Sequence, residues 1–324
     1  MMKAAIFEKT GQPNEVVEYI DVPNVEPAAG EVRVKVKAAN INPSDIMFIR
    51  GMYGITPQLP SSAGFEAAGI IDAVGEGVNL PVGMAVIFSH IGVWQEYVVT
   101  KAKGIIPKPK PMSFEFACQA FVNPFTAYGM LEVSGLKSGD WLLITAGASA
   151  YGKLVIQLAA KKGIKTIATV RREEQKEMLI AIGATHVINT ESEKMPKSVL
   201  AVTDGKGVKA VFDAVGGTLG ARALASLAVG GTMHVFGLLS LENLPLNSGL
   251  MIFKNLTIKG FWLTTYLESL SKEQREKAFT EVLGGLASSD LKLDIEATYP
   301  LSKIKEALAH YEREGRTGKI ILTE

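Results

Sequence analysis

Trp141-Leu-Leu-Ile-Thr-Ala-Gly-Ala-Ser-Ala-Tyr-Gly-Lys153, with the residues that follow it as far as Arg172, decides the fold of this chain. Apolar runs, small residues and helix formers succeed one another here, and they predict a buried strand at 141–146, a turn at 147–152, a helix at 153–162 and a second strand at 166–170. A helix that opens at such a turn brings backbone N–H groups and the positive end of its dipole to one place. This arrangement suits a pyrophosphate, so we expect a dinucleotide site. An ordinary βαβ turn followed by a solvated charge run is the alternative.

Three residues of the turn and two at the end of the second strand are the candidate cofactor contacts. Gly147 and Gly152 allow close approach of the backbone, and Ser149 can donate to the pyrophosphate. A site for NAD usually carries Asp or Glu about 20 residues further on, to hold the ribose 2′-hydroxyl. Here the strand ends in Arg171 and Arg172, whose guanidinium groups suit a 2′-phosphate. The sequence therefore predicts NADPH as the cofactor.

Length and composition describe a globular chain of about two domains. The 324 residues are 47% hydrophobic and 21% charged, and the formal net charge is +1, which gives no overall attraction to nucleic acid or anionic lipid. We find no run of about 18 apolar residues that would mark a membrane span. The single cysteine, Cys118, favours a reducing compartment. We expect a cytoplasmic protein that binds neither nucleic acid nor membranes.

The first 110 residues or so carry short strands separated by turn signals. Valines alternate with charged residues at 31–37, which is typical of a half-buried strand, and further strands are predicted at 67–74, 84–89 and 94–100. These segments indicate an antiparallel barrel or sandwich. Near the other end, a helix at 302–314 precedes a lone strand at 319–323, which needs a sheet to join. The N-terminal barrel is the available one.

Between these ends, helices and apolar strands alternate. Strands at 186–189, 210–214, 232–236 and 257–261 follow the first two, and six such strands predict a doubly wound parallel sheet. Ligands of these sheets lie outside the carboxyl ends of the strands. The residues there, which are candidates to line the nicotinamide half of the site, are Gly216, Phe236, Gly237, Phe261 and Leu263. We expect an α/β fold with this domain (121–265) inserted into the other (1–120 and 266–324).

Four motifs carry a resemblance to a known family. They are Ile41-Asn-Pro-Ser-Asp45, Ile49-Arg-Gly-Met-Tyr53, Val122-Asn-Pro-Phe-Thr-Ala-Tyr128, and Leu250-Met-Ile-Phe-Lys-Asn-Leu256 running into Lys259-Gly-Phe-Trp-Leu263. From end to end the chain resembles the medium-chain dehydrogenase/reductase superfamily, in its zinc-free quinone oxidoreductase and 2-enoyl thioester reductase branch. The resemblance implies a GroES-like domain built from both chain ends, a Rossmann domain between them, and a cleft where the two meet.

The zinc ligands of the superfamily are replaced in this chain. Zinc-dependent relatives use a Cys where Asn42 stands and Gly-His-Glu where this chain has Gly64-Phe65-Glu66. Amide and phenyl groups cannot replace thiolate and imidazole as zinc ligands. We therefore expect hydride transfer without a metal, to an acceptor that is already polarised.

The resemblance assigns roles to five residues. Tyr53 matches the catalytic tyrosine of the enoyl thioester reductases; a phenol can stabilise a developing enolate and supply the proton for the α-carbon. Packing over the nicotinamide is its alternative role. Asn42 is expected to bind substrate or the cofactor ribose, unless it only forms the turn before Pro43. Trp262 is expected to wall the acyl site or else to lie in the core. Asn123 and Thr126 match residues near the nicotinamide, with helix capping as the alternative.

Three functions are in view. The first is NADPH-dependent reduction of a polarised C=C bond in an enone or, most closely, a trans-2-enoyl thioester. The second is NADPH:quinone oxidoreduction, which needs no acid. The third is NADPH binding without catalysis. The last Rossmann strand, 256–261, would be a free apolar edge, so we also expect a homodimer paired through it.

Overall fold

The computed structural model describes residues 1–324, which divide into two compact units. The first unit comprises Met1–Val122 and Leu293–Glu324, and the second is Asn123–Lys292. Residues 266–292 belong to the second unit, whereas the sequence placed them in the first. Packing explains their place, because the ring of Phe279 lies 4.6 Å from that of Phe125, and the Gln157 side chain hydrogen-bonds the backbone of Lys292.

The first unit is built from β-strands and short helices. Its strands are β1 (Met2–Phe7), β2 (Val17–Val22), β3 (Glu31–Asn40), β4 (Ser61–Ser62), β5 (Glu66–Val74), β6 (Ala85–Ser89), β7 (Tyr97–Lys101), β8 (Ile106–Pro107), β15 (Ile295–Pro300) and β16 (Lys319–Thr323). Its helices are α1 (Pro13–Val16), α2 (Pro43–Ile49), α3 (Phe114–Ala117) and α12 (Ile304–Tyr311), with 3₁₀ turns at Ala102–Gly104 and Leu301–Lys303. Strand β3 follows the predicted alternation, since its valines are buried between charged neighbours.

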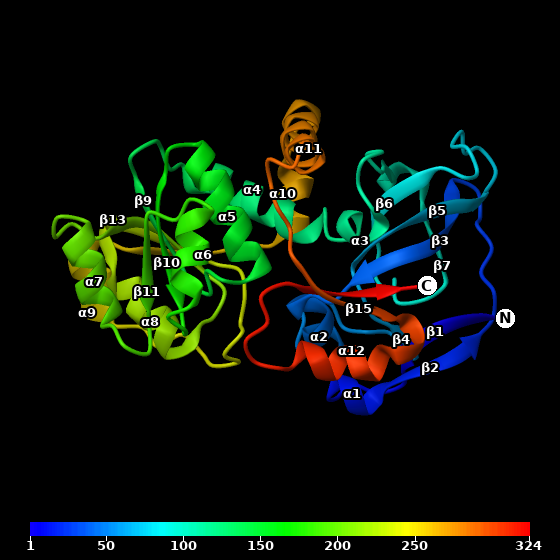
Figure 1. The fold of residues 1–324 in the computed structure, drawn as a ribbon, viewed down its shortest axis with the longest axis horizontal. Helices are drawn as coiled ribbons and strands as arrows, with labels where there is room; N and C mark the ends of the chain where they lie inside the picture. The colour runs from blue at the N-terminus through cyan, green and yellow to red at the C-terminus, as the bar shows by residue number, and fades with distance from the viewer. The chain divides into compact units, whose positions relative to one another are not determined.

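The C-terminal strand lies inside the larger sheet of this unit, between β15 and β3. Strands β2-β1-β4 form one sheet, and β15-β16-β3-β5-β6-β8 form the other, with β7 also paired to β3. Strand β16 runs antiparallel to β3, with Ile321 opposite Asn40, so the last strand lies among N-terminal ones (Figure 1). Every pairing in the two sheets is antiparallel except that of β15 with β16. The prediction that the final strand joins the N-terminal sheet is confirmed.

The second unit alternates helices and parallel strands. Its strands are β9 (Trp141–Ile144), β10 (Lys165–Val170), β11 (His186–Asn189), β12 (Val208–Asp213), β13 (Leu227–Val235) and β14 (Thr257–Gly260). Its helices are α4 (Val122–Ser134, which begins at the last residue of the first unit), α5 (Ala150–Lys161), α6 (Gln175–Ala181), α7 (Met195–Val202), α8 (Gly217–Ala225), α9 (Ser248–Lys254), α10 (Leu263–Ser269) and α11 (Lys272–Ala287). None of the helices of the chain is both long and apolar enough to cross a membrane.

The six strands form one parallel sheet in the order β11-β10-β9-β12-β13-β14. Within this sheet, the path of the chain starts at the central strand β9 and continues outward through β10 to β11. It then crosses to the other side of β9, where β12 lies. The strand order therefore reverses beside β9, and a doubly wound sheet binds its ligand at that point. The predicted six-stranded parallel sheet is confirmed.

Candidate active site

The turn after β9 is built around a helix cap. Strand β9 ends at Ile144, and Ala146 has a φ of 51°, so the backbone has already left the strand before Gly147. Helix α5 begins at Ala150, three residues before the predicted start, because the Ser149 hydroxyl accepts a hydrogen bond from the Gly152 N–H (3.0 Å) and caps the helix. The hydroxyl keeps its own proton to donate to a ligand.

Both glycines of the turn are required by close contacts. A Cβ on Gly147 would lie 2.6 Å from the Cβ of Ala168 on β10, and a Cβ on Gly152 would lie 2.5 Å from the Gly147 carbonyl oxygen. The turn is therefore packed directly on the neighbouring strand. The first N–H groups of α5 have no carbonyl partner within the helix, and they face this turn. These features fit a phosphate group.

Tyr151 directs its ring into the core of the second unit. The ring lies 4.1 Å from the ring of Phe236, and its hydroxyl hydrogen-bonds the Met130 sulfur (2.8 Å). Burial raises the pKa of Tyr151 well above its ordinary value. Phe236 thus packs beneath the turn and supports it, in addition to lying at the end of its strand.

Arg171 and Arg172 follow β10 directly, as predicted. Arg171 is exposed, and Arg172 is partly exposed with its Nε 3.5 Å from Glu174. Glu173, the acidic residue closest to the strand end, is occupied elsewhere, because its carboxylate accepts hydrogen bonds from Lys176 (2.9 Å) and Asn189 (3.1 Å). The strand end thus presents guanidinium groups, and these fit a 2′-phosphate better than a ribose hydroxyl pair.

A buried aspartate that the sequence analysis did not single out holds the next strand end. Asp213, at the end of β12, accepts hydrogen bonds from the Thr145 hydroxyl (2.7 Å) and from the Gly216 N–H (3.0 Å). It therefore ties the loop that carries Gly216 to the end of β9. At β13, a Cβ on Gly237 would lie 2.7 Å from the carbonyl oxygen of Ala214, so glycine is needed here as well. In the sequence, the signal for this role of Asp213 was an aspartate that ends an apolar strand and precedes two glycines.

The remaining predicted residues of this unit lie on α4 and around β14. Asn123 and Thr126 lie in the first turns of α4, one partly exposed and the other buried. The Phe261 N–H donates to the Val235 carbonyl (2.9 Å). Trp262 precedes the first residue of α10, Leu263, and is 42% exposed, which favours a wall of a binding site over a core position.

Tyr53 lies in the first unit on a well-anchored loop. Helix α2 ends at Ile49, and Gly51 has a φ of +70°, the left-handed conformation that favours glycine at a helix end. The N–H of Met52 donates to the carbonyl of Met47 (2.8 Å). The Tyr53 ring then packs on Phe65, with ring centroids 5.1 Å apart. This position holds the phenol on a rigid surface.

Asn42 belongs to a buried polar network in the same unit. Its side-chain amide donates to the side-chain oxygen of Asn40 and to Glu66 Oε1 (both 2.9 Å), and its side-chain oxygen accepts from the Lys319 ammonium. All four residues are at most 5% exposed. The Asn42 amide is therefore fully used within the chain, and it also precedes α2 as its N-cap residue. The geometry favours the structural alternative over the predicted substrate contact.

The network extends to two neighbouring elements. Glu66 Oε2 accepts hydrogen bonds from the N–H groups of Phe121 (3.1 Å) and Val122 (2.8 Å), and Asp45 accepts one from the Asn42 N–H (2.7 Å). Burial raises the pKa of Asp45 to about 8, against the opposing effects of that N–H and of Lys319. In the sequence, Glu66 stands out only as part of the altered zinc motif, and no pattern marks Lys319 as a site residue.

These residues do not fit a zinc ion. The Asn42 amide nitrogen and the Glu66 oxygens are engaged in hydrogen bonds, Phe65 offers no donor atom, and Lys319 brings a buried amino group to the same place. An ammonium group and a divalent cation would repel each other there. No step of the chemistry below involves a metal.

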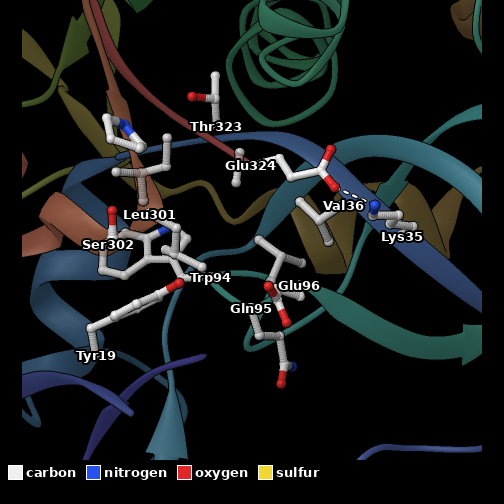
Figure 2. Close-up of a pocket in the computed structure, with 14 residues that line it drawn as sticks. Tyr19, Lys35, Val36, Trp94, Gln95, Glu96, Leu301, Ser302, Thr323 and Glu324 are labelled. Carbon is white, nitrogen blue, oxygen red and sulfur yellow. Dashed lines mark ion pairs between the residues drawn. The ribbon is translucent and has the colours of Figure 1, made fainter. Parts of the chain in front are cut away.

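A cavity of about 130 Å³ lies elsewhere on the first unit. Figure 2 shows Tyr19, Trp94 and Leu301 lining it, together with the ion pair between Lys35 and Glu324. No predicted site residue lines this cavity, so it is distinct from the candidate site.

Two family models match the chain. The model described as alcohol dehydrogenase GroES-like domain matches residues 28–110, and the one described as zinc-binding dehydrogenase matches residues 150–282. They correspond to the two units of the fold.

Relatives named for an enzymatic activity match almost the whole chain. The mitochondrial enoyl-[acyl-carrier-protein] reductase of Arabidopsis thaliana is 36% identical over 99% of this chain and 88% of its own length, and the human protein of the same name is 32% identical with the same coverage. Among solved structures, Escherichia coli quinone oxidoreductase complexed with NADPH superposes with a TM-score of 0.92 at 29% identity, covering 99% of this chain and all of that one. The chain belongs to the medium-chain dehydrogenase/reductase superfamily, among its enoyl reductase and quinone oxidoreductase members.

Proposed function

We propose that this protein reduces a C=C bond conjugated to a carbonyl group, with NADPH as the reductant and trans-2-enoyl thioesters as the preferred acceptors. The observation that carries the proposal is Tyr53, a phenol held on the loop after α2 by packing against Phe65. Quinone reduction requires no such acid, whereas reduction of an enoyl thioester does. The relatives named as enoyl-[acyl-carrier-protein] reductases support the same choice.

The second unit holds the cofactor in this proposal. The Ser149 hydroxyl and the opening N–H groups of α5 bind the pyrophosphate, and Arg171 and Arg172 bind the 2′-phosphate. The other cofactor contacts are Gly147, Gly152, Gly216, Phe236, Gly237, Phe261, Leu263, Asn123 and Thr126. The structural relative complexed with NADPH supports this choice of cofactor.

NADPH supplies the hydride when it is bound, and the protein must then stabilise and protonate the product. Addition of hydride to the β-carbon leaves negative charge on the carbonyl oxygen of the acceptor. The Tyr53 hydroxyl donates to that oxygen or passes its proton to the α-carbon, directly or through water. Trp262, partly exposed, is proposed to wall the acyl site.

The test is the loss of NADPH absorbance with two acceptors in parallel. We expect saturable turnover of crotonyl-CoA, and slower turnover of a simple 1,4-quinone. Quinone turnover without thioester turnover would replace this proposal by the quinone reductase function, which the E. coli relative represents. NADPH binding with no turnover of either acceptor would favour the non-enzymatic alternative.

We also propose that two copies pair through the β14 edge. Strand β14 is the last strand of its sheet and is paired on one side by β13. On the helix before it, Ile252 and Phe253 are 70% and 85% exposed, which is unusual for large apolar side chains. An unpaired edge beside such side chains favours association.

Sedimentation at micromolar concentration is expected to show a particle of twice the 34.7 kDa chain mass. Phe253→Asp should convert it to a monomer, because a charge would be buried at the interface. Ile180→Asp, at another exposed apolar position of the same unit, should leave the dimer intact. A wild-type monomer would contradict the proposal.

A further inference from the structure

The buried network of the first unit contains a complete charge pair around a polar amide. The Lys319 ammonium donates to the oxygen of the Asn42 side chain, and the nitrogen of the same amide donates to Glu66. The positive group thus faces the negative end of the amide dipole and the carboxylate faces the positive end. This is the favourable orientation at both ends. Burial lowers the pKa of Lys319, and the nearby carboxyl groups of Glu66 and Asp45 oppose that shift.

Glu66 connects this pair to the start of α4. Its second oxygen accepts hydrogen bonds from the N–H groups of Phe121 and Val122, the last two residues of the N-terminal segment of the first unit. These are orphan donors at the beginning of a helix, and a carboxylate there also interacts favourably with the helix dipole. Asn123 and Thr126, both proposed cofactor contacts, follow on the same helix.

Glu66 also follows, in the sequence, the residue whose ring supports Tyr53. Phe65 immediately precedes it, is 8% exposed, and packs against Tyr53 on one side and Phe48 on the other. A displacement of the Glu66 backbone would be passed on to Phe65, because the two residues are joined by one peptide bond. The network is therefore linked, through the neighbouring residue Phe65, to the residue that the proposed reaction needs as its acid.

We propose that Lys319 is a positioning residue whose ammonium organises this site in place of a metal ion, fixing Asn42 and Glu66 and, through Glu66, both Tyr53 and the start of α4. It touches neither substrate nor cofactor. The inference rests on the proposed function for its effect on turnover, but its effect on the network is independent of that function. Because the pair is buried, removal of one partner leaves the other charge without compensation.

The first test is Lys319→Met, which keeps the side-chain length and removes the charge. We expect kcat for crotonyl-CoA to fall by at least about tenfold, because small displacements of catalytic groups are costly. The dissociation constant of NADPH should change by less than about threefold, since only Asn123 and Thr126 among its proposed contacts lie on α4, and the pyrophosphate and 2′-phosphate contacts do not. The matched control is Lys35→Met, which removes one of the two ion pairs between β3 and Glu324 (Lys37 makes the other) and should change neither value. A folded Lys319→Met variant with wild-type kcat would overturn the proposal.

The second test does not depend on activity. Hydrogen exchange followed by mass spectrometry should show the amides of Phe121 and Val122 exchanging at least about tenfold faster in Lys319→Met than in Lys35→Met. If the wild-type protein does not reduce thioesters but Lys319→Met still shows faster exchange at these amides, the proposed function is refuted and the role of Lys319 in the network is supported. Unchanged exchange at these amides would refute the network's role, whatever the acceptor.

A double variant decides the case if Lys319→Met does not fold. In Lys319→Met/Glu66→Gln both charges are gone, and the Asn42 amide, released from Lys319, can turn its oxygen toward the new side-chain amide at position 66. We expect the double variant to be folded and to melt higher than Lys319→Met, because replacing both members of a buried pair costs less than breaking it. Destabilisation that is additive over the two single variants would show that Lys319 does not act through Glu66.

Discussion

Tyr53→Phe is expected to lower kcat for crotonyl-CoA by about 10²-fold or more, the usual contribution of a general acid, while turnover of a 1,4-quinone stays within about twofold. The substitution removes one oxygen and leaves the ring packed on Phe65, so the loop after α2 should keep its conformation. What is lost is the donor to the developing enolate oxygen. The measurement is steady-state NADPH oxidation with both acceptors.

Tyr19→Phe is the matched control for this experiment. Tyr19 is a partly buried tyrosine of the same unit, and it lines the cavity that contains none of the site residues. Removal of the Tyr19 hydroxyl group should leave both activities unchanged. If Tyr53→Phe reduces thioesters as fast as the wild type, Tyr53 is a packing residue and the enoyl reductase mechanism proposed here is wrong.

Arg171→Ala with Arg172→Ala should raise KM for NADPH by about 10²-fold and leave KM for NADH nearly unchanged. Hydrogen bonds to charged groups contribute about 1.5–3 kcal/mol each, and NADH lacks the phosphate that these guanidinium groups would bind. The double variant should therefore lose most of its preference between the two cofactors. The measurement is kcat/KM for each cofactor at a saturating acceptor concentration.

Arg222→Ala provides the control, because Arg222 is an exposed arginine on α8 of the same unit. It tests whether a general loss of positive charge weakens NADPH binding. Equal losses for NADPH and NADH in the Arg171/Arg172 variant would show that these residues do not recognise the 2′-phosphate.

The parallel sheet was predictable because its signal is local. Strands buried on both faces are continuous apolar runs, and β10 and β11 lie within a residue of their predicted bounds. Helix α5 starts earlier than predicted because apolar periodicity does not register a cap, whereas the Ser149 hydroxyl sets the first residue. Residues 266–292 were assigned to the wrong neighbour in the fold because their packing partners, such as Phe125, lie far away in the sequence.

The buried network illustrates what the sequence could not show. A lysine at the start of an apolar strand and a glutamate after a phenylalanine would each be expected to face solvent. Only the pairing of β16 with β3 brings Lys319 to Asn42 and thence to Glu66. The resemblance pointed to Asn42 as a site residue, yet its amide is used by neighbours that no local pattern could identify.

The position of β16 has a consequence for how the protein is made. Lys319 and Asn42, which hydrogen-bond each other, are 277 positions apart in the sequence. Ribosomes add about 5–20 residues per second, so Asn42 waits on the order of 15–55 s for its partner. During that time the whole second unit emerges, and as a continuous segment it can fold first. The N-terminal sheet must meanwhile persist without β15 and β16, so the edge of β3 that pairs with β16 is open, and such an edge favours aggregation and binding by chaperones.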